Sequence, residues 1–368
     1  MPFRNTSTGG FFLPSTPKFG LPQVLNDFDL ACVLGIKAKT MWWMIVDRKD
    51  LYHVFTIPKS SGGKRIIHAP DIRLKRIQKV LYGRFLKPIP FGPHVAAYVP
   101  GRGVLETPPD HVKKKLILHL DIKDFFTSTR QGPVKDMFRD YLGYSPDVAS
   151  LLASLVTVPH TFEFGMRYIV PQGSPASGAV CNAVVDYKID QPILQMLKDE
   201  FAEGEWTYSR YSDNVFLSTP HDIERDAADE MLKRVRRVYR KNGGYRLNEK
   251  KTRFQRPGKP QRVLGISTAE HPNIPSEVYR RLRAIIHNCL THGPEKQYAR
   301  AKCRDAEHLF TVLEGKLRYW QQVSPEKIAP LQEELHQAVM AWAAGVYEDV
   351  EVAPVAQAEE ESQEASTA

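Results

Sequence analysis

Two apolar segments, far apart in this chain, each meet an aspartate, and this pair constrains the fold more than any other feature. The first segment, residues 116–120, reads Leu-Ile-Leu-His-Leu and runs directly into Asp121. The second surrounds Asp213 and alternates apolar and polar residues about a tight turn, as a β-hairpin does. An ionised carboxylate beside a buried strand is costly unless it is paired or bound to a metal. One such aspartate is most simply a turn residue, but two suit a pair of divalent cations that clamp the oxygens of a phosphoryl transfer.

The formal charge is unevenly distributed along the chain. The whole chain carries a net charge of +9, yet from Val346 onward it has seven acidic residues and no Lys or Arg. Removing these seven negative charges raises the formal charge of the remainder to +16. A body this basic attracts polyanions and raises their encounter rate. Charge alone leaves two interpretations open, a nucleic-acid-binding protein and a merely soluble basic protein.

Composition excludes several other classes of protein. With 42% hydrophobic and 10% aromatic residues the chain can bury a core, which excludes a wholly disordered protein. It has no apolar run of the roughly 18 residues that span a bilayer, and its first residues do not resemble a signal peptide. The four cysteines have no metal-site spacing and are interpreted as free thiols in a reducing compartment. We therefore expect a cytoplasmic protein without membrane association.

The hydrophobic periodicity predicts a mixed α+β body followed by an all-helical region. Strands are expected within residues 52–57, 65–69, 116–120, 162–169, 206–217, 245–247 and 263–267. Helices are expected at 24–49, 72–86, 133–141, 146–156, 179–197 and 225–241. Beyond Pro275 the pattern is helical until periodicity is lost near Val346.

Three short segments carry the chemistry, and their order along the chain is specific. The first contains Asp121 and the pair Phe125 and Phe126. The second is the Pro-Gln-Gly-Ser-Pro run at 171–175, and the third is the Tyr-Ser-Asp-Asn run at 211–214. In this order they resemble the catalytic and nucleotide-positioning motifs of the reverse transcriptase family, and within it the bacterial retron and group II intron branches. Further segments that resemble motifs of this family lie in register at 57–66, 98–103, 247–252, 263–265, 274–288 and 313–319.

The resemblance covers about residues 52 to 335 and implies a right-hand polymerase. Such a protein has an α+β fold, with fingers and palm built on an antiparallel sheet and with an α-helical thumb. We expect the fingers and palm over residues 26–270 and the thumb over 271–345. The Gly-, Pro-, Ser- and Thr-rich residues 1–25 are expected to form an arm outside the core, and residues 346–368 a disordered acidic tail.

By resemblance, the catalytic residues are Asp121, Asp213, Asn214 and Lys251. Asp121 and Asp213, together with the backbone carbonyl of Ile122, would bind Mg²⁺ or alternatively Mn²⁺. Lys251 is a candidate proton donor to the leaving pyrophosphate, although a lysine within a basic run is more often a solvated charge.

The resemblance also implies which residues hold the incoming nucleotide. Lys59 and Arg65 would hold its triphosphate, Gln172 would hydrogen-bond near it, and Gly173 would let the backbone approach it. Phe126 would be the ring under the sugar that rejects a 2′-hydroxyl, so deoxynucleoside triphosphates are the expected substrate. For Phe126, simple core packing is an equally weighted alternative.

The residues expected to contact nucleic acid come from three segments. Arg102 lies in a Gly-Arg-Gly run, and Gly265 lies in a turn that would grip the primer. In the helix expected after Pro275, an apolar stripe leaves other faces to Arg280, Arg281 and Arg283, which suits contact with phosphates. The expected partners are a structured non-coding RNA that serves as template and primer, its DNA product and, as a further candidate, an effector protein.

The sequence departs from the family pattern at several positions. Asn214 stands where the family has an aspartate; it keeps an oxygen ligand but removes a negative charge, so reduced or metal-selective catalysis is expected. The family's Asn-Ala-X-X-His reads Thr-Pro-Pro-Asp-His here and keeps only His111, and its Val-Thr-Gly reads Val-Leu-Gly at 263–265. A divergent retron-like or phage-defence enzyme is therefore as tenable as a standard retron reverse transcriptase.

Three functions remain open from the sequence. They are an RNA-templated DNA polymerase, a catalytically silent RNA-binding scaffold, and a polymerase that adds nucleotides without a template. The intact Asp121 and Asp213 favour an enzyme, whereas Asn214 favours the scaffold. We predict an RNA-directed DNA polymerase of antiviral defence that transfers nucleotides to a primer 2′- or 3′-hydroxyl.

Overall fold

The computed structural model describes residues 16–59 and 62–347, and the chain divides into two units, Met1–Leu264 and Gly265–Ala368. Most of the expected N-terminal arm, nearly all of the acidic tail, and Ser60 and Ser61 lie outside the described residues. In the described part of the arm, Leu21 and Val24 are buried in the hydrophobic core of the first unit. These two residues pack with the core, whereas residues 16 and 18–20 are exposed.

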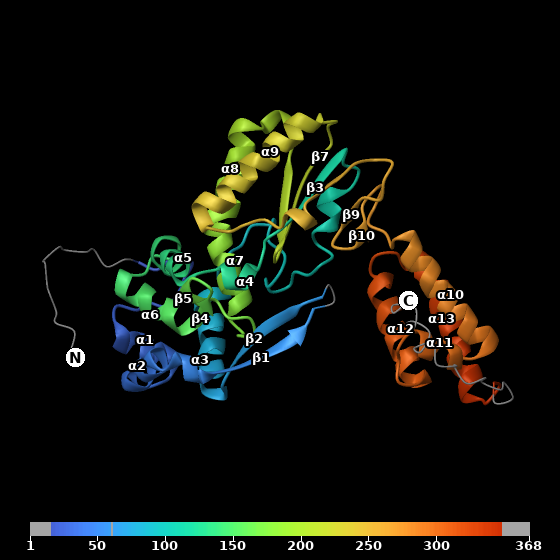
Figure 1. The fold of residues 1–368 in the computed structure, drawn as a ribbon, viewed down its shortest axis with the longest axis horizontal. Coiled ribbons are helices and arrows are strands. Elements are labelled where there is room, and N and C mark those ends of the chain that lie inside the picture. The colour runs from blue at the N-terminus through green and yellow to red at the C-terminus, as the bar shows by residue number, and fades with distance from the viewer. Residues whose placement is uncertain (1–15, 60–61, 348–368) are drawn as a thin grey trace, which may run out of the picture. The chain divides into compact units, whose positions relative to one another are not determined.

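A four-stranded antiparallel sheet with the strand order β6-β7-β3-β8 organises the first unit (Figure 1). Its strands are β3 (Leu116–Asp121), β6 (Thr207–Tyr211), β7 (Asn214–Thr219) and β8 (Arg253–Gln255). Residues of β3 are buried on both faces, which is why its apolar residues form a continuous run instead of alternating. In the β3–β7 pair, Leu116 lies opposite Thr219 and Asp121 lies opposite Asn214. The antiparallel sheet confirms the predicted α+β class.

One predicted strand is wrong. Residues 245–247 make only an isolated bridge, from Leu247 to Ile122, and the fourth strand of the sheet is β8 instead. Tyr245 is buried, and its hydroxyl hydrogen-bonds the Thr129 hydroxyl at 2.8 Å. This segment is therefore fixed through a buried side chain, not through a ladder of backbone hydrogen bonds.

The two faces of the sheet have different surroundings. Leu118, Leu120 and Leu217 point into the main core, which contains buried residues of α7 (Ser177–Val185), α8 (Gln191–Glu200) and α9 (Arg225–Val238) (Figure 1). The other face carries a small separate cluster that includes Ile117 and Phe216. Because successive strand residues point to opposite faces, the side chains of residues 119, 121 and 214 lie on the face of this small cluster.

The remaining elements of the first unit surround this sheet. The predicted hairpin is confirmed as β1 (Tyr52–Pro58) and β2 (Lys64–Pro70), and a second hairpin comprises β4 (Val158–Phe162) and β5 (Gly165–Ile169). The helix expected over 24–49 is two helices, because Gly35 adopts a left-handed conformation with φ of 70° and ends the first of them. The α-helices of this part are α1 (Asp27–Leu34), α2 (Ala38–Val46), α3 (Ile72–Leu81), α4 (Phe125–Ser128), α5 (Gln131–Asp136) and α6 (Pro146–Val156).

The second unit is helical, as predicted. Short strands stand on either side of the unit boundary, β9 (Arg262–Val263) before it and β10 (Ile266–Ser267) after it. The helices are α10 (Ser276–His292), α11 (Glu295–Arg300), α12 (Ala306–Gln321) and α13 (Pro325–Ala343), and they enclose a core of their own. The apolar stripe predicted for α10 is confirmed, since Leu282, Ile286 and Cys289 are buried in this core. No helix in the described part of the chain is long and apolar enough to cross a membrane.

Candidate active site

The two aspartates singled out in the sequence meet at one end of the central sheet. Asp121 is the last residue of β3, and Asp213 lies in the two-residue turn between β6 and β7. The backbone N–H of Ile122 donates to the carbonyl oxygen of Asp213 at 2.8 Å and ties the turn to the end of β3. Ser212, the first residue of this turn, has φ of 60°, a conformation that is uncommon outside glycine and asparagine. We call Asp121 and Asp213 the carboxylate edge.

The chain only partly neutralises the carboxylate edge. Asp121 is 3% exposed, and the ammonium of the half-exposed Lys251 lies 2.6 Å from its Oδ2. Burial raises the pKa of Asp213, the facing Asp121 carboxylate raises it further, and Lys251 and Arg65 offset only part of the rise. Burial raises the pKa because it removes water from the ionised carboxylate, and a bound cation would offset that cost. The edge is therefore a place where a cation is favoured.

The side chain of Asn214 lies next to the carboxylate edge and hydrogen-bonds one of its two carboxylates, that of Asp213. Its Nδ2 donates to Oδ1 of Asp213 at 3.2 Å, and its Oδ1 lies 3.0 Å from Nε2 of His119. At Asp121, the backbone carbonyl oxygen accepts a hydrogen bond from the backbone N–H of Asn248. Its carboxylate accepts one from the ammonium of Lys251. Asp121, Asp213, Asn214 and Lys251 are thus brought together as the sequence predicted, although their roles remain proposals.

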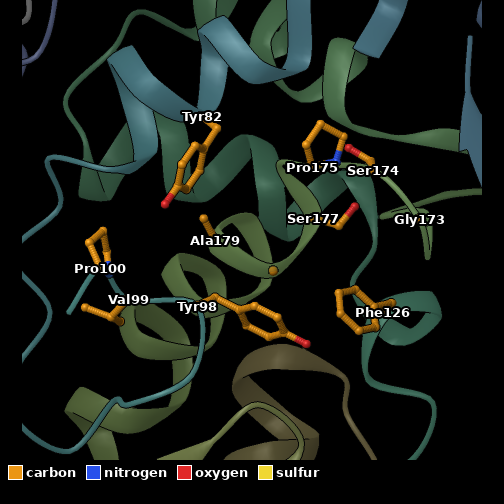
Figure 2. Close-up of a pocket in the computed structure, with 11 residues that line it drawn as sticks. Tyr82, Tyr98, Val99, Pro100, Phe126, Gly173, Ser174, Pro175, Ser177 and Ala179 are labelled. Carbon is orange, nitrogen blue, oxygen red and sulfur yellow. The ribbon is translucent and has the colours of Figure 1, made fainter. Parts of the chain in front are cut away.

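A pocket of about 380 Å³ adjoins the predicted sugar-contacting ring (Figure 2). Phe126 and Tyr98 lie next to each other along one side of it, with their ring centroids 6.2 Å apart and nearly perpendicular. The Tyr98 hydroxyl accepts a hydrogen bond from the Ser212 hydroxyl in the turn that carries Asp213. Phe126 is only partly buried, so its ring is not simply a core side chain. Gly173 lines the same pocket.

The segment around Gly173 is shaped by β2. The carbonyl oxygen of Gln172 accepts a hydrogen bond from the backbone N–H of His68 at 2.8 Å. Gly173 has φ of 127°, and a Cβ there would lie 2.9 Å from the carbonyl oxygen of His68. The glycine is therefore required by the close approach of β2, whatever it also does for a ligand. Gln172 itself does not line the pocket.

The residues predicted for triphosphate and nucleic-acid binding lie in several places. Lys59 and Arg65 are exposed on the β1–β2 hairpin. Arg102 is different, because its guanidinium donates to the carbonyl oxygens of Phe91, Gly92 and Val95 and so clasps its own loop. The residues in the second unit are exposed on α10 or, for Gly265, stand at the unit's start with φ of 84°: Arg280, Arg281, Arg283 and Gly265.

Sequence reasoning missed a buried ionic network directly behind the turn. Arg210, fully buried in β6, donates to both carboxylate oxygens of Asp190: Nη2 and Nε lie 2.7 and 2.9 Å from Oδ2, and Nε lies 3.1 Å from Oδ1. The Tyr208 hydroxyl donates to the same carboxylate at 2.6 Å, and the Arg210 guanidinium also donates to Asn182. Burial alone would lower the pKa of Arg210, but Asp190 reverses this and raises it. A hint in the sequence was an arginine in the predicted strand just before the turn, three residues before Asp213.

His94 and Asp186 extend this network. His94 Nε2 lies 2.8 Å from Asp186 Oδ1, and the other Asp186 oxygen accepts from the Tyr141 hydroxyl. Burial would raise the pKa of Asp186, but the hydrogen bond from His94 and its other donors outweigh burial and lower it. Among the described residues, His94, Asp186 and Asp190 form the one cluster of three side chains close enough to share a metal ion. Their ligand atoms already have protein partners, so we interpret them, with Tyr208 and Arg210, as a closed network.

His111 is another buried side chain on these strands. Its two ring nitrogens lie 2.5 and 2.7 Å from the hydroxyls of Ser209 in β6 and Ser218 in β7. Burial lowers the pKa of His111 to about 3, so the ring is neutral at ordinary pH. The histidine retained from the family pattern therefore links two strands of the sheet.

Comparisons with known proteins agree with this geometry. The family model described as reverse transcriptase (RNA-dependent DNA polymerase) matches residues 57–268. The chain is 31% identical over 325 residues to the retron Mx65 reverse transcriptase of Myxococcus xanthus, which covers 84% of this chain and 71% of that protein. It is 29% identical to the retron Mx162 reverse transcriptase of the same organism, covering 76% of this chain and 61% of that protein.

Matches to more distant proteins are weaker. The retron Ec86 reverse transcriptase of Escherichia coli is 25% identical, covering 73% of this chain and 79% of that protein. Among solved structures, a telomerase from Candida albicans with an RNA fragment covers 82% of this chain and 61% of its own, at 11% identity. Its TM-score of 0.44 is too low to support an inference.

Proposed function

The chain belongs to the reverse transcriptase family, in its retron type, and we propose that it copies an RNA template into DNA by two-metal nucleotidyl transfer onto a primer hydroxyl. RNA-directed DNA polymerase activity follows from that membership; the template, the two-metal chemistry and the biological role are the proposed part. The observation that carries the chemistry is the carboxylate edge, where Asp121 and Asp213 meet at the end of paired strands.

The carboxylate edge fits the divalent metals that reverse transcriptases generally use. Oxygen ligands from carboxylates and backbone carbonyls are those that Mg²⁺ prefers. Asp121 and Asp213, with the carbonyl of Ile122, would hold Mg²⁺ or Mn²⁺. When bound, such ions supply charge that stabilises the attacking and leaving oxygens of the transfer.

The chain's own residues would bind and orient the nucleotide around this edge. Arg65, whose charge acts to lower the pKa of Asp213, would bind the triphosphate together with Lys59. Phe126, at the pocket beside the edge, would contact the sugar and exclude a 2′-hydroxyl. Lys251, which donates a hydrogen bond to Asp121, would act as the proton donor to the leaving pyrophosphate.

The proposed substrates are deoxynucleoside triphosphates and a structured non-coding RNA that also supplies the priming 2′- or 3′-hydroxyl. The named relatives are retron reverse transcriptases, and the body of this chain is strongly basic. Exposed arginines on α10 support contact with phosphates. We further propose that the protein acts in the cytoplasm in phage defence, together with an effector protein.

Primer extension on an RNA template tests the proposal. Labelled deoxynucleotides would be supplied in Mg²⁺ and separately in Mn²⁺ to the wild type, Asp213→Ala and Asp222→Ala. Asp222 is an exposed acid shortly after β7 and serves as the matched control. We expect extension by the wild type and by Asp222→Ala, and none by Asp213→Ala. A Phe126→Ala variant should accept ribonucleotides more readily, by roughly 10- to 200-fold in relative kcat/KM.

Two other functions correspond to other outcomes. Tight RNA binding without extension in either metal would identify an RNA-binding scaffold instead of a polymerase. Nucleotide addition that does not depend on the template sequence would identify a template-independent polymerase. Asn214 is the residue that supports the scaffold as an alternative, because it replaces one carboxylate of the family's pattern.

A further inference from the structure

The side-chain amide of Asn214 is engaged on both ends. Its Oδ1 lies 3.0 Å from Nε2 of His119 on the neighbouring strand β3, and its Nδ2 donates to Oδ1 of Asp213 at 3.2 Å. An amide oxygen can only accept, so the bond to His119 comes from an Nε2–H group. The hydrogen bonds therefore run in one direction, from His119 through Asn214 to Asp213.

His119 is fixed by packing as well as by this hydrogen bond. Its ring stacks on that of Phe216, with centroids 4.6 Å apart and planes 11° from parallel. Phe216 is fully buried in the small core on this face of the sheet. In the β3–β7 register His119 lies opposite Phe216, and Asn214 lies two residues away on the same face. The sheet thus holds the ring where its Nε2–H reaches the amide.

An asparagine at this position makes a different contact from the aspartate that stands there in the family. A carboxylate at position 214 has no hydrogen to donate to Asp213, and it would add a third negative charge next to Asp121 and Asp213. The amide donates to Asp213 Oδ1 and so fixes the orientation of that carboxylate. Turning the amide to offer its oxygen to a metal would break the hydrogen bond between that oxygen and His119.

We propose that Asn214 is a positioning residue: together with His119 it orients the Asp213 carboxylate and does not itself bind the metal. The proposal rests on the proposed function in one respect, the assignment of Asp213 as a metal ligand. It leads to an expectation opposite to the one drawn from the sequence. Asn214→Asp, which restores the residue of the family, lowers the activity of this chain.

The test uses variants that remove one feature each in the full chain. Asn214→Ala removes donor and acceptor, Asn214→Asp removes the donor and adds a negative charge, and His119→Phe keeps a stacking ring but removes the Nε2–H. His221→Phe is the control, because His221 is a half-exposed histidine beyond β7. Binding of Mn²⁺ to each protein would be measured by electron paramagnetic resonance without nucleic acid. The urea midpoint in EDTA and primer extension would be measured on the same preparations.

We expect Asn214→Ala and His119→Phe each to weaken Mn²⁺ binding by about 10- to 100-fold, the range for side chains that orient metal ligands. The double variant should lose no more than either single variant, because both break the same chain of hydrogen bonds. Asn214→Asp should lower extension by a factor in the same range. His221→Phe should match the wild type in all three measurements.

Three results would overturn the proposal. Increased extension by Asn214→Asp would show that the missing carboxylate limits the enzyme. Loss of Mn²⁺ binding in Asn214→Ala but not in His119→Phe would make the amide a ligand. Additive losses in the double variant would indicate two unrelated contacts. A wild type that extends no primer, with variants that still lose Mn²⁺ binding non-additively, would contradict the proposed polymerase activity and leave the positioning role of Asn214 in place.

Discussion

Arg210 and Asp213 are three residues apart on the β6–β7 hairpin, yet the charges around them are arranged in opposite ways. In the closed network around Arg210, the guanidinium and the Asp190 carboxylate satisfy each other, and Tyr208 donates a further hydrogen bond. At the carboxylate edge, Asp213 faces another carboxylate, and burial raises its pKa. Asp121 is buried like the members of the network, whereas Asp213 is only partly buried.

The difference lies in which charges the chain itself neutralises. A buried ion pair with all its hydrogen bonds formed holds elements together and loses several kcal/mol when one partner is removed. A buried carboxylate left short of positive charge lowers stability and favours a ligand that supplies that charge. Proximity alone would favour His94, Asp186 and Asp190 as a metal site, whereas the hydrogen-bond partners of these residues favour the carboxylate edge that we propose.

Removing the charge of Asp213 should reduce activity without reducing stability. Asp213→Asn should lower single-turnover primer extension by on the order of 10³-fold, since metal charge stabilisation is worth several kcal/mol. Its free energy of unfolding should stay the same or rise, because a charge no longer sits beside Asp121. Urea unfolding in EDTA measures the second quantity. A variant that is markedly less stable than the wild type would show that the edge is structural.

Breaking the closed network should have the reverse effect. Arg210→Met should cost roughly 3–5 kcal/mol of unfolding free energy, because it leaves the buried Asp190 carboxylate without its cation. The double variant Arg210→Met, Asp190→Leu should recover most of that loss. Urea denaturation followed by circular dichroism gives both values. An equally large loss in the double variant would mean that packing, and not charge pairing, explains the network.

His111 should make the free energy of unfolding depend on pH. Its folded pKa of about 3 lies below the ordinary value of about 6.5, so below pH 6.5 the unfolded chain binds a proton that the folded chain does not. Stability should therefore fall as the pH drops, by about 2 kcal/mol between pH 7 and pH 5. His111→Gln should remove this part of the pH dependence when unfolding is measured at both values. An unchanged dependence would place the titrating group elsewhere.

The smallest effect on stability is expected from Arg65, whose charge acts on Asp213 of the carboxylate edge. Arg65 is exposed, so Arg65→Gln should change the free energy of unfolding by no more than about 0.5 kcal/mol, in contrast to Arg210→Met. It should raise the KM for deoxynucleotides by about tenfold, the worth of one hydrogen bond to a charged group. Steady-state extension kinetics measure this value. A KM equal to that of the wild type would remove Arg65 from the nucleotide site.

The sequence was informative about the site because spacing and residue type are local. A run of apolar residues ending in Asp121 and a tight turn at Asp213 indicated two strands with carboxylates at their ends, and these strands do pair. Lys251 was found only through the resemblance, since a lysine in a basic run has no distinctive pattern. Arg102 was expected to contact nucleic acid, but its guanidinium hydrogen-bonds its own loop. Nothing in a Gly-Arg-Gly run indicates this arrangement.

By itself the sequence determined the α+β class, the helical second unit and the two strands that present the carboxylate edge. These follow from periodicity and turn residues, which act over a few positions of the chain. Only the tertiary structure decided that Asp190 pairs with Arg210 and that His119 bonds Asn214, residues far apart in sequence. Whether a buried charge is neutralised depends on atoms within a few ångströms, and sequence distance does not determine which atoms those are.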